Sequence, residues 1–111
     1  MIDLILHYEP KTLIMAIKKQ YLKSKPVCKV TFTVPTDDAN EVVVAGSFND
    51  WNEKEFQLKK LKNGSFKGTI DLEVPKKYEF RYIIDGVWTN DAEADGQVAN
   101  SLNSENSILD L

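Results

Sequence analysis

Two tryptophans, Trp51 and Trp88, are the side chains best suited to hold a ligand, because polar groups accompany both in the sequence. Trp51 lies in the run Phe48-Asn49-Asp50-Trp51-Asn52-Glu53, which is rich in turn formers and follows an apolar segment. An indole beside amides can stack on the apolar face of a sugar ring while the polar groups bond the hydroxyls at its edge. The alternative for Trp51 is a loop cap over the end of the core.

The sheet face on which Trp88 lies follows from the turn before it. Asp85-Gly86 is typical of a two-residue hairpin, and antiparallel pairing across it sets Trp88 opposite Ile83. Opposed side chains share one face of a sheet, so Trp88 lies beside Ile83 and, diagonally, Arg81. The other face is expected to be the core, because it carries Tyr78, Phe80, Tyr82, Ile84 and Val87. Trp88 is therefore predicted to be exposed beside a guanidinium, as in a ligand platform.

The expected affinity is modest. Covering about 100 Å² of indole at ~25 cal/mol/Å² contributes roughly 2–3 kcal/mol per tryptophan. Two such faces and a few hydrogen bonds, less the cost of association, predict a dissociation constant on the order of millimolar to micromolar. A module of that affinity works by tethering to a polymer with repeated sites.

The acidic residues show no pattern typical of catalysis or metal binding. Glycoside hydrolysis needs two carboxylates about 5 Å or more apart in a shaped cleft, and no motif places them. Asp91, Glu93 and Asp95 have the spacing of part of a calcium loop, but we interpret them as a solvated loop because the rest of that signature is missing. One histidine, His7, and one cysteine, Cys28, allow neither a Cys/His metal cluster nor an internal disulfide. We expect no enzyme, no metal and no cofactor.

Length and charge narrow the class of protein. A chain of 111 residues with 42% hydrophobic and 28% charged residues fits one globular domain with a modest appendage. Residues 85–111 carry six acidic and no basic side chains, which argues against nucleic acid as a partner. The apolar run Leu4-Ile5-Leu6 is too short for a signal peptide or a membrane span. We expect a cytoplasmic protein that binds neither nucleic acid nor membrane.

The segment before residue 27 has the pattern of a helix. Pro10 suits a first turn, and Leu13, Ile14, Ile17 and Tyr21 recur on one stripe, which predicts a helix over residues 10–23. Ser24-Lys25-Pro26 ends that pattern, because the residue before proline is pushed out of the helical region. Residues 2–8 fit a strand or a helix equally well. We place a domain boundary at residue 26, between an N-terminal helical extension (1–26) and a second unit (27–111).

From residue 27 the hydrophobic period changes to two. The expected strands are residues 30–34, 41–48, 56–61, 66–74, 78–84, 87–89 and 107–111. Asn63-Gly64 is a second hairpin signal between two of them. About seven short strands with turns at this spacing predict an all-β, immunoglobulin-like β-sandwich that carries the N-terminal α-helical extension.

Three segments together resemble carbohydrate-binding module family 48. They are residues 42–51, with G-S-F-N-x-W, residues 78–91, with Y-x-F-x-Y-x-x-D-G-x-W, and residues 106–109. That family includes the glycogen-binding domain of the AMP-activated protein kinase beta subunit and the N-terminal modules of isoamylases and glycogen branching enzymes. The resemblance covers about residues 27–111.

The resemblance implies an early-set immunoglobulin-like sandwich that binds α-1,4-glucans such as glycogen or starch without catalysis. It matches Trp51 and Trp88 to the tryptophans that stack on glucose, and Arg81 to a basic residue that is lysine in the kinase module. Through an expected loop over residues 92–101, it also matches a leucine that enters the ring of a curved glucan and two polar donors. These are Leu102, Ser104 and Asn106.

We therefore expect an α-glucan-binding module that tethers or targets a partner to the polysaccharide. The alternative is a regulatory module that docks a protein, with vestigial sugar binding. The predicted helix bears on both, since it either packs on the sandwich or, as a basic amphipathic helix, meets a membrane, a partner protein or a second copy. Met15 and Leu22, apolar on its far side, leave the second role open.

Overall fold

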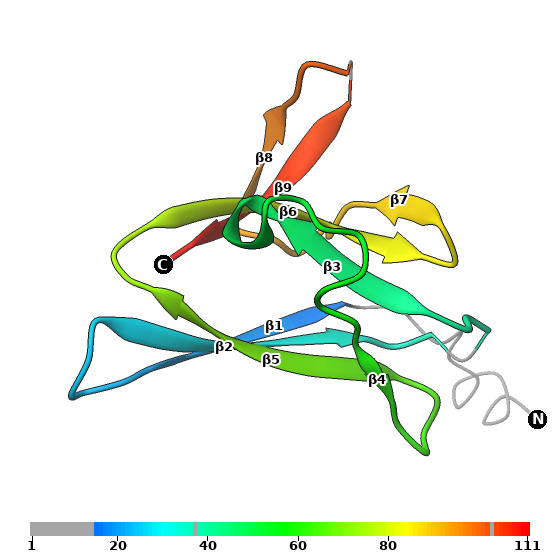
Figure 1. Ribbon diagram of the computed structural model, residues 1–111, viewed down its shortest axis with the longest axis horizontal. Helices are drawn as coiled ribbons and strands as arrows, with labels where there is room; N and C mark the ends of the chain where they lie inside the picture. The colour runs from blue at the N-terminus through cyan, green and yellow to red at the C-terminus, as the bar shows by residue number, and fades with distance from the viewer. Residues whose placement is uncertain (1–14, 37, 103) are drawn as a thin grey trace, which may run out of the picture.

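The computed structural model describes residues 15–36, 38–102 and 104–111, which form nine strands and one 3-10 helix (Figure 1). The elements are β1 (Ala16–Tyr21), β2 (Val27–Val34), β3 (Val42–Gly46), η1 (Ser47–Asn49), β4 (Lys59–Lys60), β5 (Phe66–Glu73), β6 (Lys77–Ile84), β7 (Val87–Thr89), β8 (Gly96–Ala99) and β9 (Glu105–Asp110). No helix among the described residues is long and apolar enough to cross a membrane.

The strands form two antiparallel sheets that face each other as a β-sandwich (Figure 1). The first sheet has the order β1-β2-β5-β4, and the second has the order β3-β6-β9-β8, with β7 paired to β6. Within the second sheet, β6 pairs with β9 through its first half and with β7 through its last three residues. Strand β6 is therefore the element that connects the other parts of this sheet.

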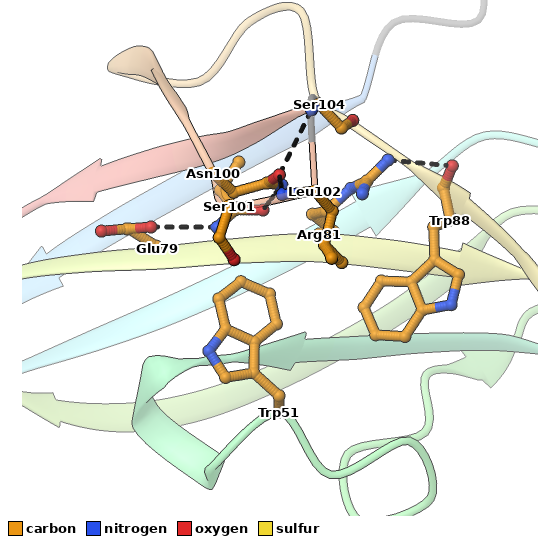
Figure 2. A pocket seen from close by; sticks show the side chains of 9 residues that line it. Trp51, Glu79, Arg81, Trp88, Asn100, Ser101, Leu102 and Ser104 are labelled. Carbon is orange, nitrogen blue, oxygen red and sulfur yellow. Dashed lines mark hydrogen bonds between the residues drawn. The ribbon is translucent and has the colours of Figure 1, made fainter.

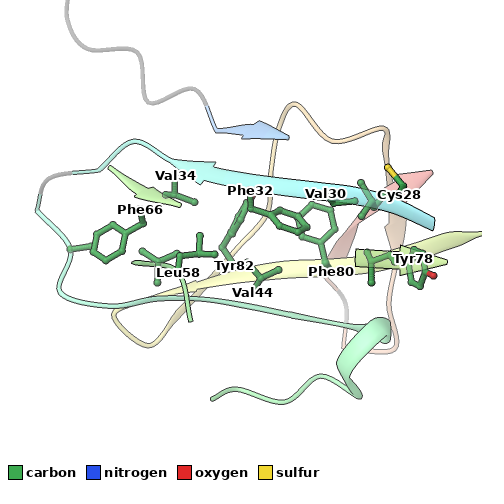
Figure 3. Packing of buried hydrophobic residues seen from close by; sticks show 14 residues of the cluster. Cys28, Val30, Phe32, Val34, Val44, Leu58, Phe66, Tyr78, Phe80 and Tyr82 are labelled. Atoms are coloured by element: carbon green, nitrogen blue, oxygen red, sulfur yellow. The ribbon is translucent and has the colours of Figure 1, made fainter. Parts of the chain in front are cut away.

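The core lies between the sheets because the period-two pattern directs one side of each strand inward. Val30, Phe32 and Val34 of β2 are at most 2% exposed, and they point toward β6 (Figure 3). The Phe32 ring lies 5.3 Å from that of Phe80 and 6.1 Å from that of Tyr82, centroid to centroid, both in edge arrangements. This aromatic packing fixes which face of β6 is turned outward.

The register predicted for the β6–β7 hairpin is confirmed. Ile83 pairs with Trp88, and Asp85 and Gly86 form the turn with φ of 48° and 84°. Glycine adopts such positive φ at no steric cost. The side chain of Asp85 also holds the turn, since its Oδ1 accepts the N–H groups of Asn40 and Glu41, both at 2.9 Å. Val87 is 64% exposed, so its predicted place in the core is wrong, because the sheet ends at the turn.

The loop at Asn63-Gly64 is longer than the two-residue turn that this dipeptide favours. Lys60 pairs with Phe66, and the Leu61 N–H donates to the Ser65 carbonyl at 2.7 Å. Residues 62–64 therefore form the loop, with Gly64 at a φ of 92°. The strand expected over residues 56–61 is correspondingly reduced to the two residues of β4.

The helix predicted over residues 10–23 is wrong in its described part, because Ala16–Tyr21 forms strand β1. This strand pairs with β2 from Ala16 opposite Thr33 to Tyr21 opposite Cys28. Ile17 and Tyr21, four apart, fit one helix stripe but equally one strand face, and cross-strand pairing outweighs the weak helical preference. Residues 1–14, which include the start of the predicted helix and the ambiguous segment 2–8, lie outside the described residues. The residues Ser24-Lys25-Pro26, at the predicted boundary, lie between β1 and β2.

Lys19 connects β1 to the second sheet. Its Nζ donates to Asp95 Oδ2 at 2.7 Å and to the Asp110 carbonyl at 3.1 Å. The Asp110 N–H donates to the same carboxylate oxygen of Asp95 at 2.7 Å. A lysine that faces inward at the edge of the sandwich thus finds an acidic partner there.

Residues 92–101, expected as a loop, contain strand β8, which pairs with β9. The interpretation of Asp91 as solvated is also wrong, since Asp91 is fully buried. Tyr82 Oη donates to its Oδ2 at 2.8 Å, and the Asp91 N–H donates to Ser107 Oγ at 2.9 Å. Burial, together with the carboxylate, raises the pKa of Tyr82 above its ordinary range. In the described part of the chain, no cluster of His, Cys, Asp and Glu could hold a metal ion.

Candidate ligand-binding site

The outer face of the second sheet carries a small apolar cluster of its own. Val43, Ala45 and Ile83 point away from the core yet are at most 6% exposed, because Trp51 and Trp88 pack on them. Both indoles are half-buried on this outer face and lie outside the core between the sheets. Each ring therefore rests on a firm apolar base while part of it meets solvent.

A tight loop after β3 brings Trp51 back over the sheet. The Asn49 side chain, 8% exposed, accepts the Gly46 N–H at 3.0 Å and donates to the Val44 carbonyl at 3.1 Å. The Trp51 N–H then donates to the Gly46 carbonyl at 2.8 Å. Gly46 must lack a side chain, because a Cβ there would lie 2.5 Å from the Glu79 carbonyl oxygen. The motif G-S-F-N-x-W thus forms a loop that positions the Trp51 indole.

The two indoles form a tilted pair, with ring centroids 6.4 Å apart and an angle of 40° between their planes. Arg81 lies beside them, with Cζ 5.8 Å from the centre of the Trp88 ring and Nη2 donating to the Trp88 carbonyl at 3.4 Å. Arg81 Nε is buried and has no partner among the described residues. An unpaired buried donor is costly, so the position of this guanidinium lowers the stability of the fold.

The loop between β8 and β9 supplies the polar side of the site. Asn100 Oδ1 accepts the N–H groups of Leu102 at 2.9 Å and Ser104 at 3.2 Å. Asn100 Nδ2 donates to Asn106 Oδ1 at 3.0 Å, and Asn106 Nδ2 donates to Glu79 Oε1 at 2.9 Å. The Leu102 side chain is 82% exposed at this loop. Hydrogen bonds therefore fix the position of this loop.

These groups surround an open hollow of about 700 Å³, hereafter the outer hollow (Figure 2). It is lined by Trp51, Glu79, Arg81, Trp88, Asn100, Ser101, Leu102, Ser104 and Asn106. The structure brings all six residues of the predicted site into this one place. Their assignment as ligand contacts remains a prediction.

Sequence reasoning missed three lining residues, Glu79, Asn100 and Ser101. Glu79 could have been found, because it precedes Arg81 by two positions and so shares its strand face. Asn100 and Ser101 gave no such signal, since their place depends on β8, which was not predicted. With one carboxylate and one guanidinium, the lining suits a neutral ligand with many hydroxyl groups.

A β-sandwich that presents paired aromatic rings and convergent polar groups on one outer face has the architecture of a ligand-binding module. Residues 28–111 match the family described as the glycogen recognition site of AMP-activated protein kinase. The chain belongs to this family, which is carbohydrate-binding module family 48.

Two curated proteins are similar to part of the chain. Protein FLOURY ENDOSPERM 6, chloroplastic, of Oryza sativa subsp. japonica is 33% identical over 63 residues, which is 57% of this chain and 12% of that protein. Protein PTST homolog 2, chloroplastic, of Arabidopsis thaliana is 40% identical over 55 residues, 50% of this chain and 10% of that protein. The matched segments thus span only about a tenth of the length of these relatives.

Proposed function

We propose that the outer hollow binds an α-1,4-glucan of the glycogen or starch type, without catalysis. The observation that carries this proposal is the tilted pair of indoles, Trp51 and Trp88, at 6.4 Å and 40°. Successive glucose rings of an α-1,4-linked chain turn relative to one another, so a curved chain can lay one ring on each indole. A flat β-1,4-linked chain would need coplanar platforms.

The polar residues around the indoles complete the proposed contacts. The guanidinium of Arg81 is a donor for a sugar hydroxyl, and the hydroxyl of Ser104 and the amide of Asn106 bond further hydroxyls. Leu102, 82% exposed, supplies an apolar contact for the inner surface of a curved glucan. Each contact is modest, so affinity for a polymer arises from repeated sites.

The role that follows is to tether a larger assembly to the polysaccharide. Membership of a glycogen-recognition family and partial similarity to two chloroplast proteins support this role. Cytoplasmic location remains a prediction from the sequence, as does the division at residue 26 into an extension and a module.

Affinity electrophoresis in gels containing glycogen tests the proposal. We expect glycogen to retard the wild-type chain, and Trp51→Ala and Trp88→Ala each to weaken the retardation. Tyr21→Ala is the matched control, since Tyr21 is an aromatic side chain 52% exposed on the first sheet. A gel containing a soluble β-1,4-glucan should not retard the chain.

Two results would count against the proposal. Retardation that survives both tryptophan substitutions would place the glucan elsewhere on the molecule. A wild-type chain that glycogen does not retard would favour the alternative role, a module that docks a protein.

A further inference from the structure

We propose that Glu79 is a positioning residue that sets the direction of a chain of hydrogen bonds leading to Leu102. The chain runs from the Glu79 carboxylate through the amides of Asn106 and Asn100 to the loop between β8 and β9. The part of this inference that concerns binding rests on the proposed function. The part that concerns the loop does not.

The first link begins at a group that can only accept. Glu79 lies on the outer face of β6, and its own N–H donates to Ser47 Oγ at 3.1 Å. An ionised carboxylate has no donor, so the group of Asn106 that faces it at 2.9 Å must be Nδ2. Because Asn106 is only 8% exposed, water offers it few other partners.

The second and third links follow from the first. With Nδ2 turned to Glu79, Asn106 presents Oδ1 to Asn100, which donates from its own Nδ2 at 3.0 Å. Asn100 is left with Oδ1 facing the loop, where the N–H groups of Leu102 and Ser104 need an acceptor. The chain is therefore fixed at one end by a carboxylate and at the other by two backbone donors.

Without the Glu79 carboxylate, the orientation of the Asn106 and Asn100 amides is no longer fixed. If Asn106 turned over, its Nδ2 would face Asn100 Nδ2, and donor would meet donor. If Asn100 turned over in response, its Nδ2 would face the N–H groups of Leu102 and Ser104. Since the Leu102 side chain is 82% exposed, its own packing would do little to hold Leu102 in place.

Amide exchange tests the loop directly and needs no ligand. In NMR hydrogen exchange on the full chain, we expect Glu79→Ala to speed exchange of the Leu102 and Ser104 N–H groups roughly three- to tenfold, the equivalent of one hydrogen bond. Glu79→Gln should stay near wild type, because its Oε1 can accept from Asn106. Glu73→Ala, an exposed glutamate on the first sheet, is the control. Unchanged exchange in Glu79→Ala would overturn the proposal.

A double-mutant cycle with cyclodextrin, a cyclic α-1,4-glucan, tests the link to binding. We expect Glu79→Ala to weaken cyclodextrin binding roughly three- to tenfold, but to have a smaller effect when Leu102→Ala is already present, because the part of the loss that passes through Leu102 is then absent. Equal losses in both backgrounds would show that Glu79 does not act through Leu102, and would contradict the proposal. If wild type bound no cyclodextrin or glycogen, the proposed function would fail, and the exchange rates would still decide the role of Glu79.

Discussion

Trp88 lies directly opposite Ile83 across the β6–β7 hairpin, and its indole covers that side chain on the outside of the sandwich. The same ring thus shields part of the protein and presents a surface to solvent. Trp51 has the same double role, since it packs on the same cluster of Val43, Ala45 and Ile83. Any test of binding that removes an indole must therefore be read beside its effect on stability.

Removal of the Trp88 ring should destabilise the fold as well as weaken glucan binding. We expect Trp88→Ala to lower the free energy of unfolding by about 1–3 kcal/mol, because it exposes Ile83 and its apolar neighbours. Trp88→Phe should recover part of that loss, since a smaller ring still covers Ile83. Urea denaturation followed by circular dichroism measures both. An unchanged midpoint in Trp88→Ala would show that the ring does not cover the sheet.

The side chain of Asn49 should be needed to hold Trp51 in position over the sheet. Asn49→Ala leaves the Gly46 N–H and the Val44 carbonyl without their partners in a buried loop. We expect a loss of about 2–3 kcal/mol in the free energy of unfolding, with weaker retardation by glycogen.

Asn49→Asp gives a sharper comparison. It keeps an acceptor for the Gly46 N–H but sets a carboxylate against the Val44 carbonyl, so it should be destabilised as well. Full stability in Asn49→Ala, measured by urea denaturation, would mean that the amide does not hold this loop.

The sequence predicted the placement of Trp88 better than the edges of the sandwich, for physical reasons. Trp88 could be placed because Asp85-Gly86 fixes a two-residue turn, and register then follows by counting. Strand β1 was missed because Ile17 and Tyr21 fit both periods, while the inward Lys19 conceals the alternation of a strand. Its distant partners, the Asp95 carboxylate and the Asp110 carbonyl, explain that lysine.

Two other failures have the same origin in distant contacts. Strand β8 contains glycine and alanine, which are poor strand formers, and it is held by pairing with β9. Asp91 looked solvated because its neighbours in sequence are polar, whereas its partners Tyr82 and Ser107 come from β6 and β9. Patterns within a segment cannot report such partners.

The buried hydrogen bond between Tyr82 and Asp91 should contribute more to the free energy of unfolding than an exposed hydrogen bond does. Tyr82→Phe keeps the ring in the core but leaves Asp91 Oδ2 without its donor. We therefore expect a loss of about 1–3 kcal/mol in the free energy of unfolding. Tyr78→Phe is the matched control, because its hydroxyl donates to the Glu73 carbonyl at a less buried position. Guanidinium denaturation of both variants makes the comparison. Equal, small losses would contradict the assigned role of Asp91.

The ion pair between Lys19 and Asp95 predicts a pH dependence of stability. Burial raises the pKa of Asp95, but hydrogen bonds from Lys19 and the Asp110 N–H, with the charge of Lys19, outweigh it and leave the pKa below 3.8. A lowered folded-state pKa stabilises the fold above the unfolded-state value, and this stabilisation is lost as pH falls through the folded-state pKa.

Lys19→Met should therefore be less stable than wild type at neutral pH, by no more than about 1 kcal/mol, because both side chains are 25–34% exposed. The difference should vanish as the pH falls well below 3.8. Lys18→Met, on the outward side of the same strand, is the control. Thermal melts between neutral pH and pH well below 3.8 measure this difference. A difference in stability between Lys19→Met and wild type that stayed constant with pH would contradict the ion pair.

The most direct test of glucan binding uses the two tryptophans themselves. The chain has only two, so its NMR spectrum contains two indole N–H resonances, which Trp51→Phe and Trp88→Phe assign. On titration with cyclodextrin, we expect both resonances to shift together along one binding curve, while Thr31 and Thr69 on the first sheet stay still. If the indole resonances stayed still while cyclodextrin moved those of the first sheet, the outer hollow would not be the glucan site.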